Sequence, residues 1–212
     1  MNTDRGRALP WIALAAVLVF VAAGPPSPPG SVPVKRQRGV ASTRPAPVAL
    51  APGDPAPRIG GTTLAGEEYD GDWSANRLTL VNFWGVWCAP CKAEMPVLEK
   101  LLRSHERDGL RIVGLEVQRA TPESSRAFVD AIGVTYPIVA VGGEALTDWG
   151  GVSIYPTTFL VGSDGRVVRK YVGATQAEID GLVADVKALL AGKPLETRMP
   201  AAEPAEAVPT PR

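Results

Sequence analysis

Two cysteines, Cys88 and Cys91, are the residues of this 212-residue chain best suited to chemistry. They are the only cysteines in the sequence, and Ala89 and Pro90 separate them. A thiol pair at this spacing can alternate between dithiol and disulfide, because the second sulfur can resolve a mixed disulfide formed on the first. The spacing therefore predicts thiol–disulfide exchange, with no cofactor beyond the two sulfurs.

The segments on either side of the pair predict a strand followed by a helix. Residues 78–84 are apolar and β-rich, which indicates a buried strand with Trp84 in the core. After the pair, apolar residues recur at helical spacing, at Val97, Leu98, Leu101 and Leu102. Cys88 then lies at a helix N-terminus, where unpaired N–H groups and the helix dipole favour a thiolate. Such surroundings lower the pKa of a cysteine from about 8.5 to roughly 3.5–7.5.

Two other interpretations of the pair stay open. A zinc site would need two further ligands, and His105 is the only histidine of the chain. We expect His105 several turns along the helix, too far to act on either thiol. A permanent structural disulfide would close a loop so short that it would constrain the unfolded chain little.

The residues around the pair resemble the active-site segment of the thioredoxin superfamily. The run Val81–Lys92 reads VNFWGVWCAPCK, and Glu94-Met95-Pro96 follows it. Over residues 53–191 the chain is most similar to the membrane-anchored TlpA/ResA-like branch, of redoxin or AhpC-TSA type. The resemblance implies an α/β, thioredoxin-like fold, with helices flanking a central mixed sheet and an N-terminal β-hairpin as an extension.

A second stretch is Ile154-Tyr155-Pro156-Thr157, in which Pro156 is the first residue of a later strand. By the resemblance, the Tyr155–Pro156 bond is cis and Pro156 lies against the dithiol. A proline has no N–H, so the backbone of Tyr155 would stay free to pair with a substrate strand. An ordinary proline at a strand edge is the alternative. We expect five residues to contact substrate: Trp87, Ala89, Pro90, Tyr155 and Thr157.

Cys91 must lose a proton before it attacks the mixed disulfide. Thioredoxins themselves carry a buried Asp on the strand before the motif, whereas this sequence has Asn82 there. Some members of the TlpA/ResA-like branch carry a Glu after the next strand, and by that resemblance Glu116 is the candidate proton acceptor. A strand-end carboxylate without this role is the alternative. We expect Glu94 and Lys92 to be exposed helix residues.

The rest of the sequence predicts an alternation of elements around the same sheet. Apolar periodicity and turn residues indicate strands at 110–117, 136–141, 156–161 and 167–172 and helices starting after Thr121, near Glu144 and after Thr175. We expect Thr121 and Thr175 to cap their helices. A hairpin with Ala65-Gly66 in its turn is expected at residues 62–69.

Composition and charge limit the classes of partner and set the domain boundaries. Lys+Arg and Asp+Glu both total 22, so nothing indicates a nucleic-acid partner. About half of the 21 prolines lie between residues 24 and 57. We expect one globular domain at residues 53–192, monomeric by default, between a Pro-rich linker at 24–52 and a disordered tail at 193–212.

The N-terminus has the pattern of a targeting segment. Residues 1–7 are polar and basic, and residues 8–23 are mostly apolar and uncharged. The apolar run is shorter than the roughly 17–25 residues of a spanning helix, which favours a cleaved signal peptide. The resemblance favours an uncleaved signal anchor. We favour the anchor, with residues 1–7 in the cytoplasm and the domain on the periplasmic side of a bacterial cell membrane; a soluble periplasmic or secreted protein is the alternative.

The resemblance also implies a reaction direction. Proteins of the TlpA/ResA-like branch reduce protein disulfides outside the cytoplasm and are supplied by a membrane thiol donor, with apocytochrome c and copper-site cysteines as typical targets. Two alternatives stay open. A non-catalytic chaperone could hold a metal or an apoprotein at the cysteine pair, since a dithiol can bind Cu(I). A thiol peroxidase is the other, although the peroxiredoxin pattern Pro-x-x-x-Thr-x-x-Cys does not precede Cys88.

Overall fold

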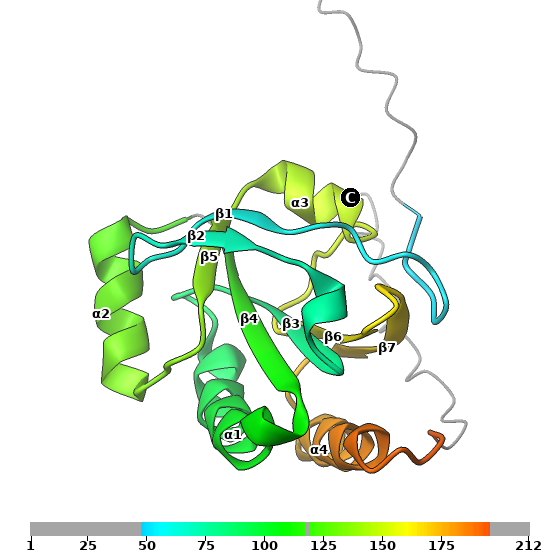
Figure 1. Ribbon diagram of the computed structural model, residues 1–212. Coiled ribbons are helices and arrows are strands. Elements are labelled where there is room, and N and C mark those ends of the chain that lie inside the picture. Colours follow the sequence, from blue (N-terminus) through cyan, green and yellow to red (C-terminus); the bar gives the residue numbers. More distant parts are fainter. Residues whose placement is uncertain (1–47, 118, 196–212) are drawn as a thin grey trace, which may run out of the picture. The chain divides into compact units, whose positions relative to one another are not determined.

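The computed structural model describes residues 48–117 and 119–195 (Figure 1). The predicted cytoplasmic segment at 1–7, the signal anchor at 8–23 and most of the linker and tail lie outside these residues. Within them, no helix is both long and apolar enough to cross a membrane.

Five strands form a mixed sheet in the order β5-β4-β3-β6-β7. The central strand β3 (Leu78–Trp84) pairs parallel with β4 (Leu110–Val117) and antiparallel with β6 (Thr157–Gly162). β5 (Ile138–Val141) extends the parallel side, and β7 (Val167–Val172) extends the antiparallel side. Every residue of β3 is buried, as expected for a strand that is covered on both faces.

Helices cover both faces of this sheet (Figure 1). α1 (Ala89–His105), α2 (Pro122–Ile132) and α4 (Gln176–Leu190) contribute to the hydrophobic cluster on one face. The short helix α3 (Gly143–Asp148) packs into the cluster on the other face. The order of strands and helices is the predicted one, and the fold is thioredoxin-like.

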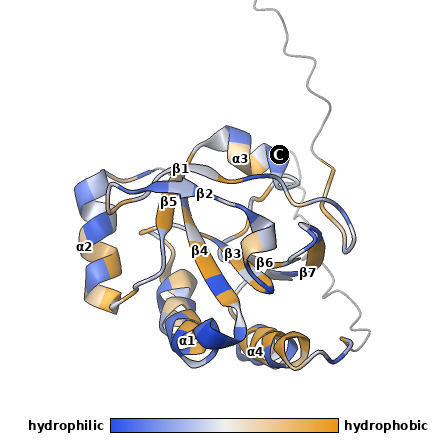
Figure 2. Cartoon of the chain, viewed as in Figure 1, coloured by the Kyte–Doolittle hydropathy of each residue, from blue (hydrophilic) through white to orange (hydrophobic). Residues whose placement is uncertain are grey.

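Successive side chains of the central strand β3 point to opposite faces of the sheet and so belong to two separate hydrophobic clusters. Leu80 and Trp84 point toward α1, while Val81 and Phe83 point toward α3, and all four are fully buried. Figure 2 shows hydrophobic residues running along β4 and β5, whereas α2 carries both polar and apolar residues, as an amphipathic helix does. The prediction that Trp84 lies in the core is confirmed.

An N-terminal hairpin precedes the central sheet, as predicted. Its strands β1 (Gly60–Thr62) and β2 (Glu68–Asp70) pair antiparallel. Gly66 lies in the turn with φ 87°, a conformation that glycine adopts at little cost. Beyond β1, a bridge from Thr63 to Val139 joins the hairpin to β5.

The helix caps follow the predicted chemistry. Thr121 accepts a hydrogen bond from the backbone of Ser124 at the start of α2, and Thr175 does the same for Glu178 at the start of α4. Gly133, with φ 79°, ends α2.

Two strands begin later than predicted, in each case after a proline. β5 starts at Ile138 rather than at residue 136, and β6 starts at Thr157, one residue after the predicted opening proline. Pro137 and Pro156 precede these starts, and a proline cannot donate a hydrogen bond to a neighbouring strand. The residues before Pro156 are thus left as a loop at the edge of the site.

Candidate active site

Cys88 and Cys91 form a disulfide at the junction of β3 and α1. Cys88 is the N-cap of α1, and its Sγ accepts a hydrogen bond from the backbone N–H of Cys91 at 3.2 Å. Cys88 is 5% exposed, whereas Cys91 is fully buried. In the reduced protein, Cys88 would therefore be the sulfur that solvent reaches first and that the N-terminal N–H groups of α1 stabilise as a thiolate.

Trp87 stands beside the disulfide as an exposed aromatic side chain. It is 43% exposed, in contrast to the buried Trp84. A Cβ at Gly85 would lie 2.7 Å from the Trp87 ring, so the absence of a side chain at Gly85 lets the indole fold back over the turn. Ala89 and Pro90 are exposed next to it.

The loop before β6 meets this aromatic side chain. The Tyr155–Pro156 peptide bond is cis, as the resemblance implied. The rings of Tyr155 and Trp87 meet edge to face, with centroids 5.1 Å apart. Because Trp87 directly precedes Cys88, this contact brings the cis-proline loop beside the disulfide.

Thr157 differs from the other predicted contact residues because its side chain is buried. It is 2% exposed, and its hydroxyl donates to the carbonyl of Ile154 at 2.7 Å. The side chain therefore fixes the loop, and the predicted contact with substrate would have to come from the backbone of Thr157.

Glu94 corrects the prediction that it is an exposed helix residue, because it is only 3% exposed. Asn82 Nδ2 donates to one of its carboxylate oxygens at 2.8 Å, and the Thr158 hydroxyl donates to the other at 3.4 Å. Asn82 also donates to Thr158 at 2.8 Å, so the three side chains form one network. Glu94 falls on the buried stripe of α1, three residues after Cys91 and four before Leu98. This helical spacing was visible in the sequence and could have identified it.

The environment of Glu94 suits proton transfer. Burial raises the pKa of this carboxyl to about 7, and the hydrogen bonds from Asn82 and Thr158 offset only part of that rise. A carboxyl with such a pKa can accept or release a proton near neutral pH. It lies one helical turn after Cys91, on the same buried face of α1.

Glu116 is also buried, but it lies within β4 rather than after it. It is 2% exposed and stands in register with Trp84 of β3. Burial raises the pKa of Glu116, and Ser125 of α2 opposes that rise in part. Within the described part of the chain, its Oε1 has no hydrogen-bond partner of good geometry. Its role as proton acceptor stays a prediction.

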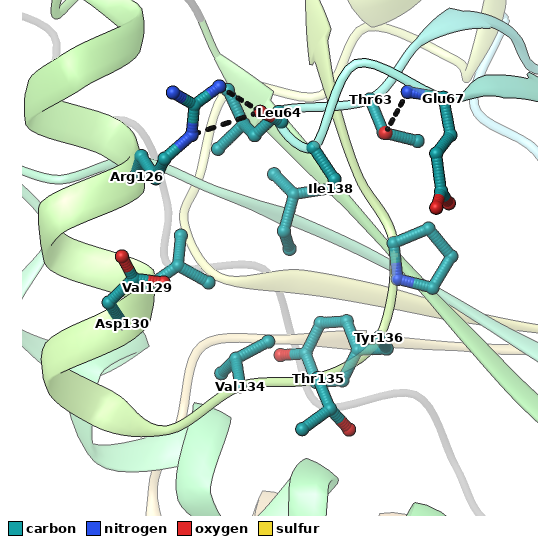
Figure 3. Close-up of a pocket in the computed structure, with 12 residues that line it drawn as sticks. Thr63, Leu64, Glu67, Arg126, Val129, Asp130, Val134, Thr135, Tyr136 and Ile138 are labelled. Carbon is teal, nitrogen blue, oxygen red and sulfur yellow. Dashed lines mark hydrogen bonds between the residues drawn. The ribbon is translucent and has the colours of Figure 1, made fainter.

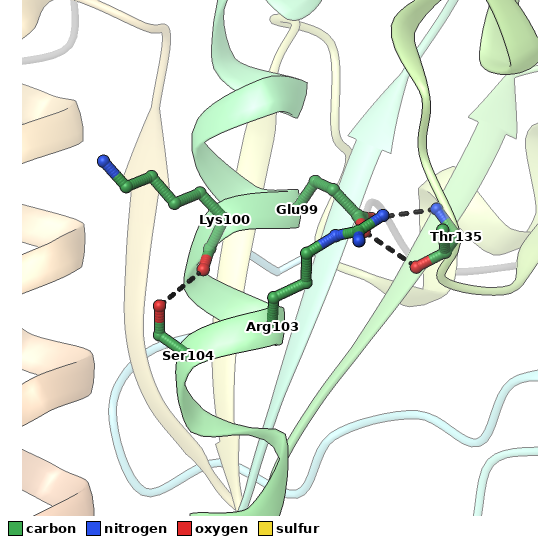
Figure 4. A network of polar contacts seen from close by, with 5 residues as sticks. All are labelled: Glu99, Lys100, Arg103, Ser104 and Thr135. Atoms are coloured by element: carbon green, nitrogen blue, oxygen red, sulfur yellow. Dashed lines mark hydrogen bonds and ion pairs between the residues drawn. The ribbon is translucent and has the colours of Figure 1, made fainter.

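Other ionisable groups of α1 have structural contacts. Glu99 is buried and accepts hydrogen bonds from the backbone and the hydroxyl of Thr135, at 2.9 and 2.8 Å, and from Arg103 at 2.7 Å (Figure 4). It thereby ties α1 to the segment before β5. His105 contacts Asp108 at 2.9 Å near the C-terminal end of α1, far along the helix from the cysteines.

A surface pocket of about 300 Å³ lies away from the disulfide, between the hairpin, α2 and the segment before β5 (Figure 3). Neither cysteine lines it. Arg126 of α2 donates to the carbonyl of Leu64 at its rim, and the buried Tyr136 forms part of its wall. Across residues 48–117 and 119–195, no group of three or more potential metal ligands occurs.

Fold and site together define a thiol–disulfide oxidoreductase of the thioredoxin type. The central strand leads into a helix that carries the Cys-x-x-Cys at its N-terminus, and a cis-proline loop lies beside it. These are the features on which thiol–disulfide exchange depends.

Comparison with known proteins agrees with this class. Residues 52–170 match the AhpC/TSA family, and the chain belongs to that family as a TlpA/ResA-like member of the thioredoxin superfamily. It is 30% identical over 135 residues to the thiol-disulfide oxidoreductase ResA of Bacillus thuringiensis (strain Al Hakam), covering 63% of this chain and 78% of that protein. It is 32% identical over 136 residues to the thioredoxin-like protein YneN of Bacillus subtilis (strain 168), covering 63% and 79%.

A solved structure shows the same fold. The thiol:disulfide interchange protein of the thioredoxin family from Chlorobium tepidum TLS superposes with a TM-score of 0.57 at 26% identity. The similarity covers 66% of this chain and 99% of that one.

Proposed function

We propose that this protein reduces disulfides of target proteins outside the cytoplasm, through its Cys88–Cys91 pair. The observation that carries the proposal is the position of Cys88 at the N-cap of α1, with Cys91 buried behind it and the Pro156 loop beside it. One sulfur is thus placed to meet a foreign disulfide, and the other is placed to release the product.

The reaction proceeds in two exchanges. The Cys88 thiolate attacks one sulfur of the target disulfide, which forms a mixed disulfide and releases the other target sulfur as a thiolate. Cys91 then loses its proton and attacks Cys88, which releases the second target sulfur. Two electrons pass to the target, and Cys88 and Cys91 end as the disulfide seen in the structure.

Glu94 is the proposed acceptor of the Cys91 proton. Its support is its burial, its pKa of about 7 and its place one helical turn after Cys91. Glu116, on the neighbouring strand, is the second candidate, and its pKa is also raised by burial. The network from Asn82 and Thr158 holds the Glu94 carboxylate in one orientation.

The exposed surface around the disulfide is the proposed docking site for the target chain. Trp87, Ala89 and Pro90 are exposed, and Tyr155 is half-buried against Trp87. Pro156 leaves the backbone before it free to pair with an extended segment.

The proposed targets are disulfides of apocytochrome c and of copper-site cysteines, with a membrane thiol donor that restores the dithiol. The support is the resemblance to the TlpA/ResA-like branch. Membrane attachment through residues 8–23, with the domain on the periplasmic side, is supported by the apolar run and the basic residues before it. The protein is proposed to act as a monomer.

Capture of targets by Cys91→Ser tests this function. The full chain carrying Cys91→Ser, reduced and mixed with an oxidised apocytochrome c or copper-site peptide, should retain a mixed disulfide on Cys88, seen by mass spectrometry. The matched Cys88→Ser variant should retain none. Failure with these peptides but success with a small disulfide would refute the target class. If the protein reacts with no disulfide but binds Cu(I) stoichiometrically, the reductase interpretation is wrong and the non-catalytic chaperone takes its place.

A further inference from the structure

An arginine that the mechanism does not use lies over the aromatic side chain beside the disulfide. The guanidinium carbon of Arg119 is 4.9 Å from the centroid of the Trp87 ring, within cation–π distance. Arg119 follows the C-terminal end of β4, at the edge of the sheet where β3 leads into the cysteine turn. The parallel pairing of β3 with β4 brings these two strand ends together.

The surroundings of Arg119 leave its charge open to solvent. The residue is exposed, and no carboxylate within residues 48–117 and 119–195 forms an ion pair with it. Trp87 itself is held on other sides, by the turn at Gly85 and by the ring of Tyr155. The guanidinium therefore lies against an aromatic ring whose position is fixed. That ring contacts both the cysteine turn and the cis-proline loop, which together form the proposed docking site.

The positive charge of Arg119 also interacts with Tyr155 of the cis-proline loop. Burial raises the pKa of Tyr155, and the positive charge of Arg119 opposes that rise. Lys92, exposed in the first turn of α1, directly follows Cys91 and is a second cation in this part of the chain. Glu94 and Glu116 are buried and do not present a carboxylate at the surface. The exposed Glu123 lies in the first turn of α2, where its carboxylate interacts with Thr121 and Arg126.

We propose that Arg119 is a specificity-determining residue, which selects target disulfides that carry an acidic side chain close to the attacked cysteine. This inference rests on the proposed function of the same site and names the chemistry of its substrates. A target segment that lies across Trp87 toward the Pro156 loop would bring its flanking side chains next to the guanidinium. A carboxylate there gains a charge-assisted contact, whereas a basic side chain meets an unpaired like charge.

Three small disulfides of different charge measure this selection directly. Anionic oxidised glutathione, cationic cystamine and the uncharged disulfide of mercaptoethanol are each mixed in excess with the reduced full chain, at low ionic strength. The second-order rate of Cys88–Cys91 formation is followed by tryptophan fluorescence. Rates are divided by the rate with the uncharged disulfide, which removes any effect of a variant on the reactivity of Cys88 itself.

Arg119→Gln should lower the normalised rate with oxidised glutathione and raise that with cystamine, by about threefold each. Arg119→Glu should reverse the preference, and Arg119→Lys should largely keep it. Added salt should reduce the differences, because the contact is exposed. A residue that only supports the position of Trp87 would instead change all three unnormalised rates in the same direction.

Arg107 supplies the matched control. It is exposed in the 3-10 turn Glu106–Asp108, before the N-terminal end of β4 and thus at the opposite end of that strand from Arg119. Arg107→Glu makes the same change in net charge and should leave the normalised rates unchanged. Equal effects of Arg107→Glu and Arg119→Glu, or no effect of either, would overturn the selection by Arg119. If the wild-type protein reacts neither with the three small disulfides nor with the target peptides of the capture experiment, the proposed function itself fails.

Discussion

At the scale of single residues, two buried carboxylates of α1 show how environment separates a chemical role from a structural one. Glu99 accepts hydrogen bonds from Thr135 and pairs with Arg103, so its charge is compensated. Among the described residues, Glu94 accepts hydrogen bonds from the neutral donors Asn82 and Thr158, and burial raises its pKa to about 7. Of the two, the buried carboxylate without a cationic partner is the better suited to take up a proton.

Replacing Glu94 by Gln should slow the second exchange. In the wild type, the rate of mixed-disulfide resolution should rise as pH passes through about 7, because Glu94 must be ionised to accept the Cys91 proton. Glu94→Gln should remove this inflection and slow resolution at pH 8 by about a hundredfold. Rapid-quench measurement of the released target thiol gives the rate.

The companion variant for this experiment is Glu116→Gln. It replaces the other buried carboxyl near the sheet end and should leave the inflection in place. If Glu116→Gln removes the inflection while Glu94→Gln does not, the proton acceptor is Glu116, as the resemblance first indicated.

At the scale of elements, the site depends on close packing of β3 and β4. Gly114 of β4 lies between Trp84 and Ile138: a Cβ there would be 2.4 Å from Ile138 Cδ1 and 2.9 Å from Trp84 Nε1. The indole of Trp84 thus occupies the space that a side chain at Gly114 would need. β3, which leads into the cysteine turn, is held in place by this contact.

Gly114→Ala should therefore lower the free energy of unfolding, by about 1–3 kcal/mol, since overpacking a tight core displaces its neighbours. Chemical denaturation of the oxidised protein measures the change. Gly143→Ala is the control, because a Cβ at Gly143 meets nothing within 4 Å and its effect should be small or stabilising. A Gly114→Ala protein as stable as the wild type would show that the packing around residue 114 can accommodate a Cβ.

The sequence predicted most elements because their signals are local. The apolar strand at Leu78–Trp84, the cap at Thr121 and the turn at Gly66 each depend on a few neighbouring residues. The strand start at Ile138 was missed because the apolar pattern continues across Pro137, while hydrogen bonding does not.

The site itself was predicted only in part. The cysteine pair and the cis-proline follow from motifs, but the burial of Glu94 requires the partners Asn82 and Thr158, which come from two other strands. The contact of Arg119 with Trp87 depends on the parallel pairing of β3 with β4, which no local pattern contains.

At the scale of the whole molecule, Glu94 should make stability depend on pH. Its pKa is about 7 in the folded protein and near 4.5 in the unfolded chain, so the folded state binds the proton more tightly. The stabilisation is complete below about pH 4.5 and is lost as pH rises through about 7, amounting to about 3 kcal/mol.

Denaturation of the oxidised protein at pH 5 and pH 8 measures this loss without any titrating thiol. In Glu94→Gln the decrease in unfolding free energy between the two pH values should shrink by that amount, while Glu99→Gln should retain it, although its overall stability falls. A wild-type protein whose stability does not decline over this range would show that Glu94 keeps an ordinary pKa.

The proposed reaction requires that Cys88 is the reactive thiolate and Cys91 the protected partner. The most direct measurement is a short pulse of iodoacetamide on the fully reduced protein over a range of pH, with the label located by peptide mass spectrometry. We predict that Cys88 is alkylated first, with a half-maximal rate below about pH 7.5, and that Cys91 stays unlabelled while the protein is folded. Labelling of Cys91 first, or a Cys88 that reacts only near pH 8.5 like an ordinary thiol, would contradict it.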